Sequence, residues 1–561
     1  MGTNHPDYVN SLEDMALVNW DAGNLEQASM YYTQAIQRTL DFIEKFFPSM
    51  SENEKSKLWF KFYPRINRYY TYVVKTNKPE EIGKMLNLQV SIKGILLSSS
   101  SKVRERILNS SDEELIKLYK QWVDQKEELV RIYSYDKKEL AEQKINLDSL
   151  EKAADEIEKK LSQRVDYFSE GIKAVTITWQ MIRDWLSDTE SCVEIINYKK
   201  YDGLRLDSSL YVAVVFDKNT NYPKVIKPKY SAQLEKKYYN YYINSIRNKT
   251  EDKYSYKAFM REIDSVTQKS KIVFFSADGI YNQININTLK NNETNKYIIE
   301  SKQIIFLANC KEIIDYKKNA AKTSINRTIG IFAHPYYGNL GIVTPLKGTQ
   351  VEAENIKKIM SPLGYKIVTY YLQQANEENL KSVKNIGILH IATHGYFLKN
   401  EDKDGFDYQM AMGIEETKAK ENPMLRSGLL LSNCEEALSN PNDKSVKKAN
   451  NGILTAYEAA SLLLDKTSLV VLSACETGLG DVKSGEGVYG LQRAFRIAGA
   501  DAILMSLWKV NDEATQKLII EFYRNLASGI EKQKALIEAQ KTLMRTFNHP
   551  YYWGAFVILG I

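Results

Sequence analysis

The sequence predicts an α/β protein in which a mostly parallel, helix-flanked β-sheet follows a second α/β region and an all-α N-terminal region. Three observations support this prediction. Apolar residues recur at helical spacing up to about residue 165, β-rich runs follow, and from residue 328 apolar strands alternate strictly with helices. Continuous apolar strands separated by helices are typical of a parallel sheet buried on both faces. We predict four regions, with boundaries at 1–78, 79–167, 168–325 and 326–561.

The first region has the spacing of a helix-turn-helix repeat. Its key positions hold Leu12, Met15, Ala16, Gly23, Leu25, Ala28, Tyr32 and Ala35. They match the 34-residue tetratricopeptide repeat, in which small residues let two helices approach closely. A second, degenerate pair of helices is predicted from about Glu52 to Lys75. Because arrays need about three repeats to be stable alone, either this part packs on the next domain or, as we favour, it is the end of a longer array.

Residues 79–167 are expected to form a long antiparallel helical hairpin. Two sets of apolar residues repeat at helical spacing, namely Leu115, Leu118, Trp122, Leu129 and Ile132, and Leu147, Leu150, Ile157 and Leu161. The other faces are rich in Glu and Lys, and we interpret them as solvated surface.

The region 168–325 is expected to be an α/β subdomain with a structural role, because no nucleophile–base pair is visible in it. Ser209–Asp217 and Lys271–Ser276 are β-rich, and Ala277–Gly279 is predicted as a hairpin turn into Ile280–Ile286.

The last region carries the strict strand–helix alternation. Strands are predicted at Thr328–Ala333, Tyr365–Leu372, Ile386–Ala392, Ser468–Ala474 and Asp501–Leu507. Helices are predicted at Gln350–Met360, Glu377–Val383, Ala456–Leu464, Gly487–Ala498, Asp512–Leu526 and Ile530–Thr546. The one long interruption, Gly395–Leu454, is expected to be mobile.

Composition restricts the function classes. Charged residues make up 26% of the chain and the net charge is only +6, which gives little support for nucleic-acid binding. The Lys- and Tyr-rich run 236–242 could stack on bases or be an amphipathic helix. The four cysteines form no CxxC pair, so we expect a reducing cytoplasm and neither a zinc site nor another cofactor. No signal region or bilayer-length apolar run is visible, so no membrane insertion is expected.

A histidine and a cysteine follow two consecutive predicted strands. His394 comes after Ile386–Ala392, and Cys475 comes after Ser468–Ala474. Parallel strands end at one sheet edge, so both side chains are expected there. A thiol nucleophile needs a neighbouring imidazole as base. For the oxyanion, the N–H groups of Gly395 and Cys475 are the predicted donors.

Other interpretations of these residues remain. A buried cysteine is often a core residue, and the intact fold could be a catalytically silent scaffold for protein interaction. His390 is expected to pack beneath the site. A metal site built from His390, His394, Cys434 and Cys475 matches no common ligand spacing.

At these residues the sequence resembles the CHAT family, caspase-like (clan CD) cysteine proteases that often carry tetratricopeptide repeats. The resemblance lies in His390-Ile-Ala-Thr-His-Gly395 and Val471-Leu-Ser-Ala-Cys-Glu-Thr-Gly478, and it continues through Gly485–Val488, Arg493–Phe495, Ser506–Trp508 and Leu346–Thr349. It implies a caspase–hemoglobinase fold, a pseudo-caspase-like 168–325 subdomain, and endopeptidase chemistry with His394 and Cys475.

The resemblance also implies a bacterial protein and a biological setting. Relatives act in defence or regulated cell death, some by cleaving gasdermin-like pore formers and some beside RNA-guided complexes. We therefore expect a protein substrate, an activating partner that docks on the repeat region, and at most an indirect relation to nucleic acid.

The specificity pocket is not determined by the sequence. Four acidic residues lie near predicted loops and could favour a basic substrate side chain: Asp278, Glu476, Asp481 and Glu486. Alternatively they are solvated, or Glu476 and Glu486 order the loop after the cysteine through backbone N–H groups.

Overall fold

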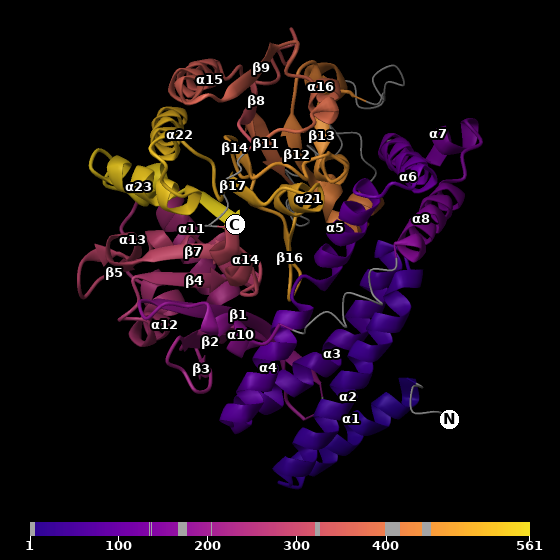
Figure 1. Ribbon diagram of the computed structural model, residues 1–561, viewed down its shortest axis with the longest axis vertical. Helices are drawn as coiled ribbons and strands as arrows, with labels where there is room; N and C mark the ends of the chain where they lie inside the picture. The colour runs from indigo at the N-terminus through magenta and orange to yellow at the C-terminus, as the bar shows by residue number, and fades with distance from the viewer. Residues whose placement is uncertain are drawn as a thin grey trace.

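The computed structural model describes residues 6–133, 135, 137–165, 177–203, 205–319, 326–398, 416–439 and 450–561. Within these residues the predicted fold class is confirmed: a helical N-terminal region precedes a large, mostly parallel sheet with flanking helices (Figure 1). The predicted boundaries near 167 and 325 fall in segments outside the described residues, as does much of the insertion after Gly395. None of the described helices is long and apolar enough to cross a membrane.

The N-terminal helices form the lower end of the molecule in Figure 1. They are α1 (Pro6–Asp21), α2 (Leu25–Phe46), α3 (Glu52–Thr76) and α4 (Pro79–Ile92). The next helix, α5 (Ile95–Leu108), lies higher, beside α21 (Leu491–Ile497). Ala16, Ala28, Tyr32 and Ala35 are fully buried, and Gly23 forms the turn between α1 and α2 with a φ of 81°. The segment from Glu52 is one continuous helix that contains Pro64, so the predicted second pair of helices is wrong.

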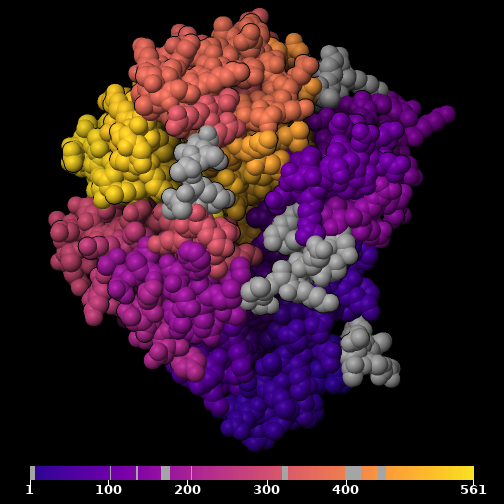
Figure 2. Space-filling model, in the orientation of Figure 1, coloured from indigo at the N-terminus to yellow at the C-terminus, as the bar shows by residue number. Residues whose placement is uncertain are grey.

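A helical hairpin is present, but it begins at Glu113 and not at residue 79, because residues 79–108 form the separate helices α4 and α5. α6 (Glu113–Ile132) and α8 (Leu147–Arg164) pack through Leu115, Leu129 and Leu161, and the short α7 (Lys137–Glu142) lies between them. In the space-filling view, this hairpin lies against the C-terminal half of the chain (Figure 2).

The two predicted α/β regions share a single eleven-stranded sheet. Its order is β3-β2-β1-β4-β7-β18-β17-β14-β10-β8-β9. The first five strands are β3 (Lys224–Ile226), β2 (Leu206–Asp217), β1 (Glu190–Tyr201), β4 (Ile272–Ser276) and β7 (Gln303–Leu307). The others are β18 (Phe556–Gly560), β17 (Ala502–Ser506), β14 (Leu469–Leu472), β10 (Ile388–Ala392), β8 (Thr328–Pro335) and β9 (Lys366–Leu372). The C-terminal strand β18 joins the halves, parallel to β7 and antiparallel to β17.

Helices cover both faces of this sheet. Over the second half these are α15 (Lys347–Met360), α16 (Glu377–Ser382), α20 (Ala456–Ala459), α21 (Leu491–Ile497), α22 (Asp512–Ala527), α23 (Lys532–Met544) and α24 (Pro550–Trp553). Over the first half these are α10 (Trp179–Asp184), α11 (Tyr239–Asn248), α12 (Arg261–Val266), α13 (Ile298–Ser301) and α14 (Glu312–Asn319). The N-terminal helices also pack on the first half, because Trp59 and Tyr70 of α3 share a core with Cys192 and Ile196 of β1. The N-terminal helices are therefore stabilised by packing against the first half of the sheet.

Smaller elements complete the fold. A three-stranded sheet contains β11 (His394–Phe397), β12 (Ser427–Leu430) and β13 (Ile453–Thr455), and α18 (Glu416–Glu421) and α19 (Cys434–Ser439) flank it. Two hairpins are β5 (Lys290–Asn291) with β6 (Lys296–Tyr297), and β15 (Asp481–Lys483) with β16 (Gly487–Tyr489). The expected hairpin into Ile280–Ile286 is wrong, because Gly279–Gln283 and Ile286–Thr288 are 3₁₀ turns.

Candidate active site

His394 and Cys475 leave adjacent parallel strands at one edge of the sheet. β10 and β14 are neighbours, and His390 lies opposite Val471 in their register. His394 follows the end of β10 by two residues and Cys475 follows the end of β14 by three. The predicted adjacency of these strands is confirmed.

Gly395 lies tightly against the loop that contains Cys475. A Cβ atom at this position would lie 2.7 Å from the carbonyl oxygen of Cys475 and 2.8 Å from Cγ2 of Thr477. Contacts that short exclude any side chain, so only glycine lets the histidine segment reach the cysteine loop.

The N–H of Gly395 faces away from its strand partner. In the β11–β12 ladder Gly395 lies opposite Leu429, while the N–H of Leu398 donates to the carbonyl of Arg426 at 2.9 Å. Hydrogen-bonded and non-hydrogen-bonded pairs alternate in antiparallel ladders. The Leu398–Arg426 pair is hydrogen-bonded, so the Gly395–Leu429 pair, three positions away, is not, and the Gly395 N–H points away from β12. This orientation suits an oxyanion donor, and that role remains a prediction.

A backbone carbonyl fixes the imidazole of His394. Its Nε2 lies 2.8 Å from the carbonyl oxygen of Thr344, and the Tyr337 ring centroid lies 5.4 Å from the imidazole centroid. A carbonyl only accepts hydrogen bonds, so Nε2 carries the proton and Nδ1 of the neutral ring is free to act as a base. Sequence reasoning missed Thr344, since a backbone carbonyl has no signal in the sequence.

The loop that provides Thr344 is held by a buried carboxylate. Glu435 accepts hydrogen bonds from the N–H groups of Leu340 (2.7 Å), Gly341 (3.2 Å) and Val343 (2.8 Å). Backbone N–H donors hold the pKa of this carboxyl below its usual range even though burial opposes them. Glu435 was also missed, and it lies in the insertion between the histidine and the cysteine.

Cys475 begins a sharp turn. The next residue, Glu476, has a φ of 55°, a left-handed conformation that non-glycine residues seldom adopt. β17 supports the turn from below: Ser506 Oγ donates to the Ala474 carbonyl at 2.6 Å, and Ser506 N–H donates to Thr477 Oγ1 at 3.1 Å.

The pKa of the Cys475 thiol is raised in this arrangement. Burial is the main cause, and the carboxylates of Glu476 and Asp512 add to it, whereas the N–H of Val510 and the charge of Lys509 act in the opposite direction. The thiol is therefore protonated at neutral pH in this conformation.

His390 lies beneath the site, as expected from its place on β10. It is fully buried, its Nε2 lies 2.8 Å from a Glu352 carboxylate oxygen, and its Nδ1 lies 3.2 Å from the hydroxyl of Tyr523. The same carboxylate accepts from Ser473 Oγ at 3.1 Å. Among the described residues, no three His, Cys, Asp or Glu side chains are grouped as metal ligands would be.

Three of the four acidic candidates are engaged inside the protein. Asp278 is buried and accepts from the N–H groups of Asn197, Gly279 and Gly485 at 2.8–3.0 Å. Asp481 pairs with the fully buried Arg426. Glu486 accepts from the N–H of Leu96 at 3.3 Å and lies 3.4 Å from Arg493.

These contacts identify Asp278, Asp481 and Glu486 as anchors of the β15–β16 hairpin. Glu486 accepts from a backbone N–H of α5 and not from one of its own loop, so it fastens the hairpin to the helical region. Glu476 is only partly buried and lies near Tyr239, so it stays the acidic candidate closest to the nucleophile.

The CHAT domain family matches residues 256–561, which is more than half of the chain. Tetratricopeptide repeat protein 28 is 37% identical over 110 residues in Homo sapiens and 36% identical in Mus musculus. Each of these matches covers 19% of this chain and only 4% of the relative's length.

Solved structures of two cysteine-protease systems are similar at a low level. The Arg-specific cysteine proteinase gingipain R has a TM-score of 0.32 at 10% identity, covering 59% of this chain and 74% of that chain. The Saccharomyces cerevisiae separase–securin complex has a TM-score of 0.37 at 9% identity, covering 100% of this chain and 44% of that chain. Neither likeness is close enough to bear on the chemistry of this chain.

Proposed function

Because this chain belongs to the CHAT domain family, we propose that it is a cysteine endopeptidase with Cys475 as nucleophile and His394 as base. One observation carries the proposal: Gly395, directly after His394, lies against the backbone of Cys475 at the shared end of β10 and β14. This arrangement supplies a thiol, an imidazole with a free Nδ1 and unblocked backbone N–H groups in one place.

In the proposed acylation step, Nδ1 of His394 takes the thiol proton and the thiolate attacks the scissile carbonyl carbon. The carbonyl electron pair moves to oxygen, where the N–H groups of Gly395 and Cys475 stabilise it. Collapse of this intermediate breaks the C–N bond, and the imidazolium gives its proton to the leaving amine. The product is a thioester on Cys475.

In the proposed deacylation step, water attacks the thioester while His394 takes a proton from it. The new carboxylic acid leaves and the proton returns to the thiolate, so the enzyme is regenerated. The Thr344 carbonyl, which accepts the Nε2 proton, keeps the imidazole in one tautomer through both steps.

The β15–β16 hairpin supports a latent enzyme that is switched on through the helical region. The hairpin follows Cys475 in the chain, and its tip is held by the helical part. Gly94 N–H donates to the Gly485 carbonyl at 2.8 Å, and Tyr63 Oη donates to Ser484 Oγ at 3.4 Å. A displacement of α3 or α5 would therefore act on the nucleophile loop.

The raised pKa of the Cys475 thiol also fits latency. A protonated thiol is a poor nucleophile, and activation in this proposal requires transfer of its proton to the His394 imidazole. The activating signal in this proposal is a protein or complex that docks on the helical region.

The biological setting rests on the family resemblance. We propose a cytoplasmic bacterial enzyme in defence or regulated cell death whose substrate is a partner protein, for example a gasdermin-like pore former. The repeat-like helices 1–78 would receive the activating partner, which in related systems includes RNA-guided complexes.

Co-expression with the products of neighbouring genes tests the proposal. The parent chain is expected to cut a neighbour product, and N-terminal sequencing of the fragment gives the substrate and the cut site together. Cys475→Ala should abolish the cut, while Cys192→Ala, which changes a buried cysteine of β1 in the other half of the sheet, should retain it. Cleavage by the Cys475→Ala chain would overturn the assignment.

A catalytically silent scaffold is the competing function. It is favoured by the raised pKa of the Cys475 thiol, which keeps the thiol protonated in this conformation. If the activated parent chain binds its partner but cuts nothing and never reacts with thiol-directed peptides, the scaffold is the correct description.

A further inference from the structure

A network of buried polar side chains lies directly beneath the candidate active site. Its members are Glu352 on α15, His390 on β10, Ser473 after β14 and Tyr523 on α22. All four are buried, and His390 and Tyr523 are fully so. Burial of polar groups costs free energy, so such a network between a sheet and its helices needs a reason. No step of the proposed peptidase chemistry uses any of these side chains.

The two oxygens of the Glu352 carboxylate contact the two strands that lead to the dyad. Oε2 accepts a hydrogen bond from Ser473 Oγ at 3.1 Å, and Ser473 lies two residues before Cys475. Oε1 lies 2.8 Å from Nε2 of His390, which lies four residues before His394. This is an ion-pair distance, although the N–H is not aligned for a hydrogen bond. One side chain therefore joins the strand of the nucleophile to the strand of the base.

Tyr523 extends the network to α22. Its hydroxyl lies 3.2 Å from Nδ1 of His390. Burial, together with the charge of Glu352, raises the pKa of this hydroxyl well above its usual range, so the hydroxyl keeps its proton. Helices α15 and α22 pack side by side (Figure 1), and the network joins both of them to the strands.

Each of these four elements also leads to a group of the candidate site. β10 and β14 lead to His394 and Cys475. α15 begins three residues after Thr344, whose carbonyl fixes the imidazole. α22 begins two residues after Val510, whose N–H lowers the pKa of the Cys475 thiol. The network is therefore a point at which side chains join the four elements around the dyad.

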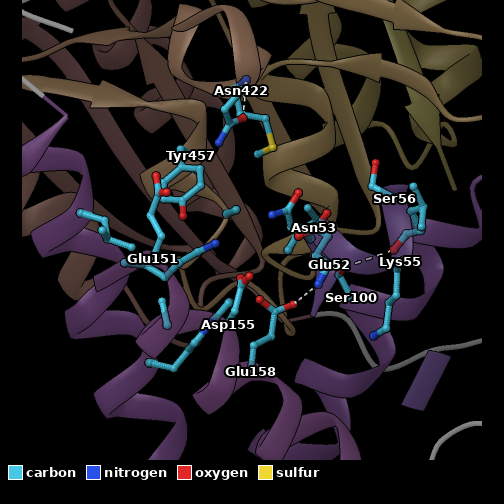
Figure 3. Close-up of a pocket in the computed structure, with 18 of the residues that line it drawn as sticks. Glu52, Asn53, Lys55, Ser56, Ser100, Glu151, Asp155, Glu158, Asn422 and Tyr457 are labelled. Carbon is cyan, nitrogen blue, oxygen red and sulfur yellow. Dashed lines mark hydrogen bonds between the residues drawn. The ribbon is translucent and has the colours of Figure 1, made fainter. Parts of the chain in front are cut away.

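A second group of carboxylates has a different place in the fold. Glu151 and Glu158 of α8 line a cavity between the helical region and the second half of the α/β part (Figure 3). Glu151 pairs with Lys418, and Glu158 accepts from the N–H of Glu52 at 2.8 Å. These contacts connect α8 to α18 and α3, whereas Glu352 connects the strands that lead to the dyad.

We propose that Glu352 is the positioning residue of the dyad. By joining His390 to Ser473 it sets the separation between the His394 imidazole and the Cys475 thiol, and it exchanges no proton with the substrate. A carboxylate suits this role because both of its oxygens accept, whereas the amide of glutamine has the same shape but only one acceptor oxygen. This role rests on the proposed function, since it requires His394 to act on Cys475.

The rate at which iodoacetamide alkylates Cys475 tests this role. The full chain is treated at neutral pH and the modified peptide is followed by mass spectrometry, so no peptide substrate is needed. Glu352→Gln should lower the rate about tenfold, because a small displacement of either reacting group is enough for such a loss. His394→Ala should lower it at least as much. Added to His394→Ala, Glu352→Gln should have no further effect, because a positioning residue acts only through the group that it positions.

A second variant and a control accompany this pair. Ser473→Ala removes the contact with β14 alone and leaves Glu352 beside His390, so a loss of about threefold is expected, again only where His394 is present. Glu190→Gln is the matched control. It removes the charge of another buried carboxylate, which pairs with Lys317 at the start of β1, and should leave the rate unchanged.

The outcomes separate this role from the peptidase proposal. A parent rate in Glu352→Gln, or an equal effect of this change with and without His394, would overturn the positioning role and leave the dyad intact. A rate that does not depend on His394 would overturn the dyad and the role of Glu352 with it. If the rates follow the expected pattern but no peptide is ever cleaved, the positioning role stands and the peptidase assignment falls.

A cleaved peptide gives a further readout. Glu352→Gln should lower kcat and leave KM within about twofold, because the network touches no substrate. A change in KM at constant kcat would contradict the positioning role.

Discussion

The two halves of the sheet are built alike but treat their strand ends differently. In the first half, β1 and β4 lead to a sealed interior, where Lys93 Nζ lies 2.5 Å from Glu194 and 2.7 Å from Ser276 Oγ. In the second half, β10 and β14 lead to His394 and Cys475, which are both partly exposed. The connection between α4 and α5 covers the ends of β1 and β4, which therefore have a structural role. The ends of β10 and β14 remain accessible.

The halves also run in opposite directions. β18 is parallel to β7 but antiparallel to β17, which is parallel to β14. The β15–β16 hairpin connects the two sets of strand ends, because it starts after Cys475 and its tip reaches Asp278. The sealed half therefore holds the loop of the open half in position.

The largest effect is expected in the open half. His394→Ala removes the proposed base and should lower kcat/KM by about 1000-fold or more, measured on any peptide that the activated chain cleaves. Thermal stability should change little, because the ring is partly exposed. Activity within tenfold of the parent would show that another group acts as base.

Gly395→Ala should have the next largest effect. The added methyl would lie 2.7 Å from the Cys475 carbonyl oxygen, so the backbone must shift and displace the proposed oxyanion donor. We expect a loss of about 100-fold in kcat. Gly348→Ala is the matched control, because its Cβ would only approach Gln516 at 3.8 Å; equal effects of the two changes would contradict the packing argument.

Glu486→Gln tests how the β15–β16 hairpin, the loop of the open half that the sealed half holds, responds to pH. Burial raises the pKa of Glu486 to about 7 from 4.5, although Arg493 opposes the shift. The folded state then holds this proton more tightly than the unfolded state, so its stabilising contribution is complete below pH 4.5 and is lost as the pH rises to about 7. In urea unfolding, the parent should lose on the order of 3 kcal/mol relative to Glu486→Gln over that range. Parallel pH profiles would contradict this.

The smallest effect is expected at the hairpin tip. Tyr63→Phe removes the 3.4 Å hydrogen bond to Ser484 and should lower the free energy of unfolding by about 1 kcal/mol. If α3 holds the β15–β16 hairpin and thereby the nucleophile loop, Tyr63→Phe should also raise the reactivity of the Cys475 thiol in the absence of an activating partner. If the thiol reacts at the parent rate, the tip does not control the nucleophile loop.

Buried strands were the most predictable part of the fold. Continuous apolar runs such as Ile386–Ala392 predict the bounds of β10, β14 and β17 to within a few residues. Because β10 and β14 are neighbours in the sheet, the residues that follow them, His394 and Cys475, lie at the same edge. Turn chemistry was less predictable. Asp278 and Asn285 cap the 3₁₀ turns after β4, which makes a hairpin unnecessary there.

Contacts between distant segments could not be predicted from the sequence. The predicted helix at Gly487–Ala498 begins only at Leu491, because Gly485 and Gly487 take positive φ angles in the β15–β16 hairpin. Nothing local indicates that Asp278 binds the Gly485 N–H, 207 residues away. The Thr344 carbonyl and the Glu435 carboxylate likewise gain their roles only through folding.

Identification of the labelled cysteine tests the central claim most directly. The full chain, with and without its activating partner, is treated with a thiol-reactive peptide probe and digested for mass spectrometry. The dyad predicts label on Cys475 that increases on activation and is lost in His394→Ala, with Cys192, Cys310 and Cys434 unlabelled because they are buried. Label on another cysteine, or label on Cys475 that does not depend on His394, would contradict the proposed dyad.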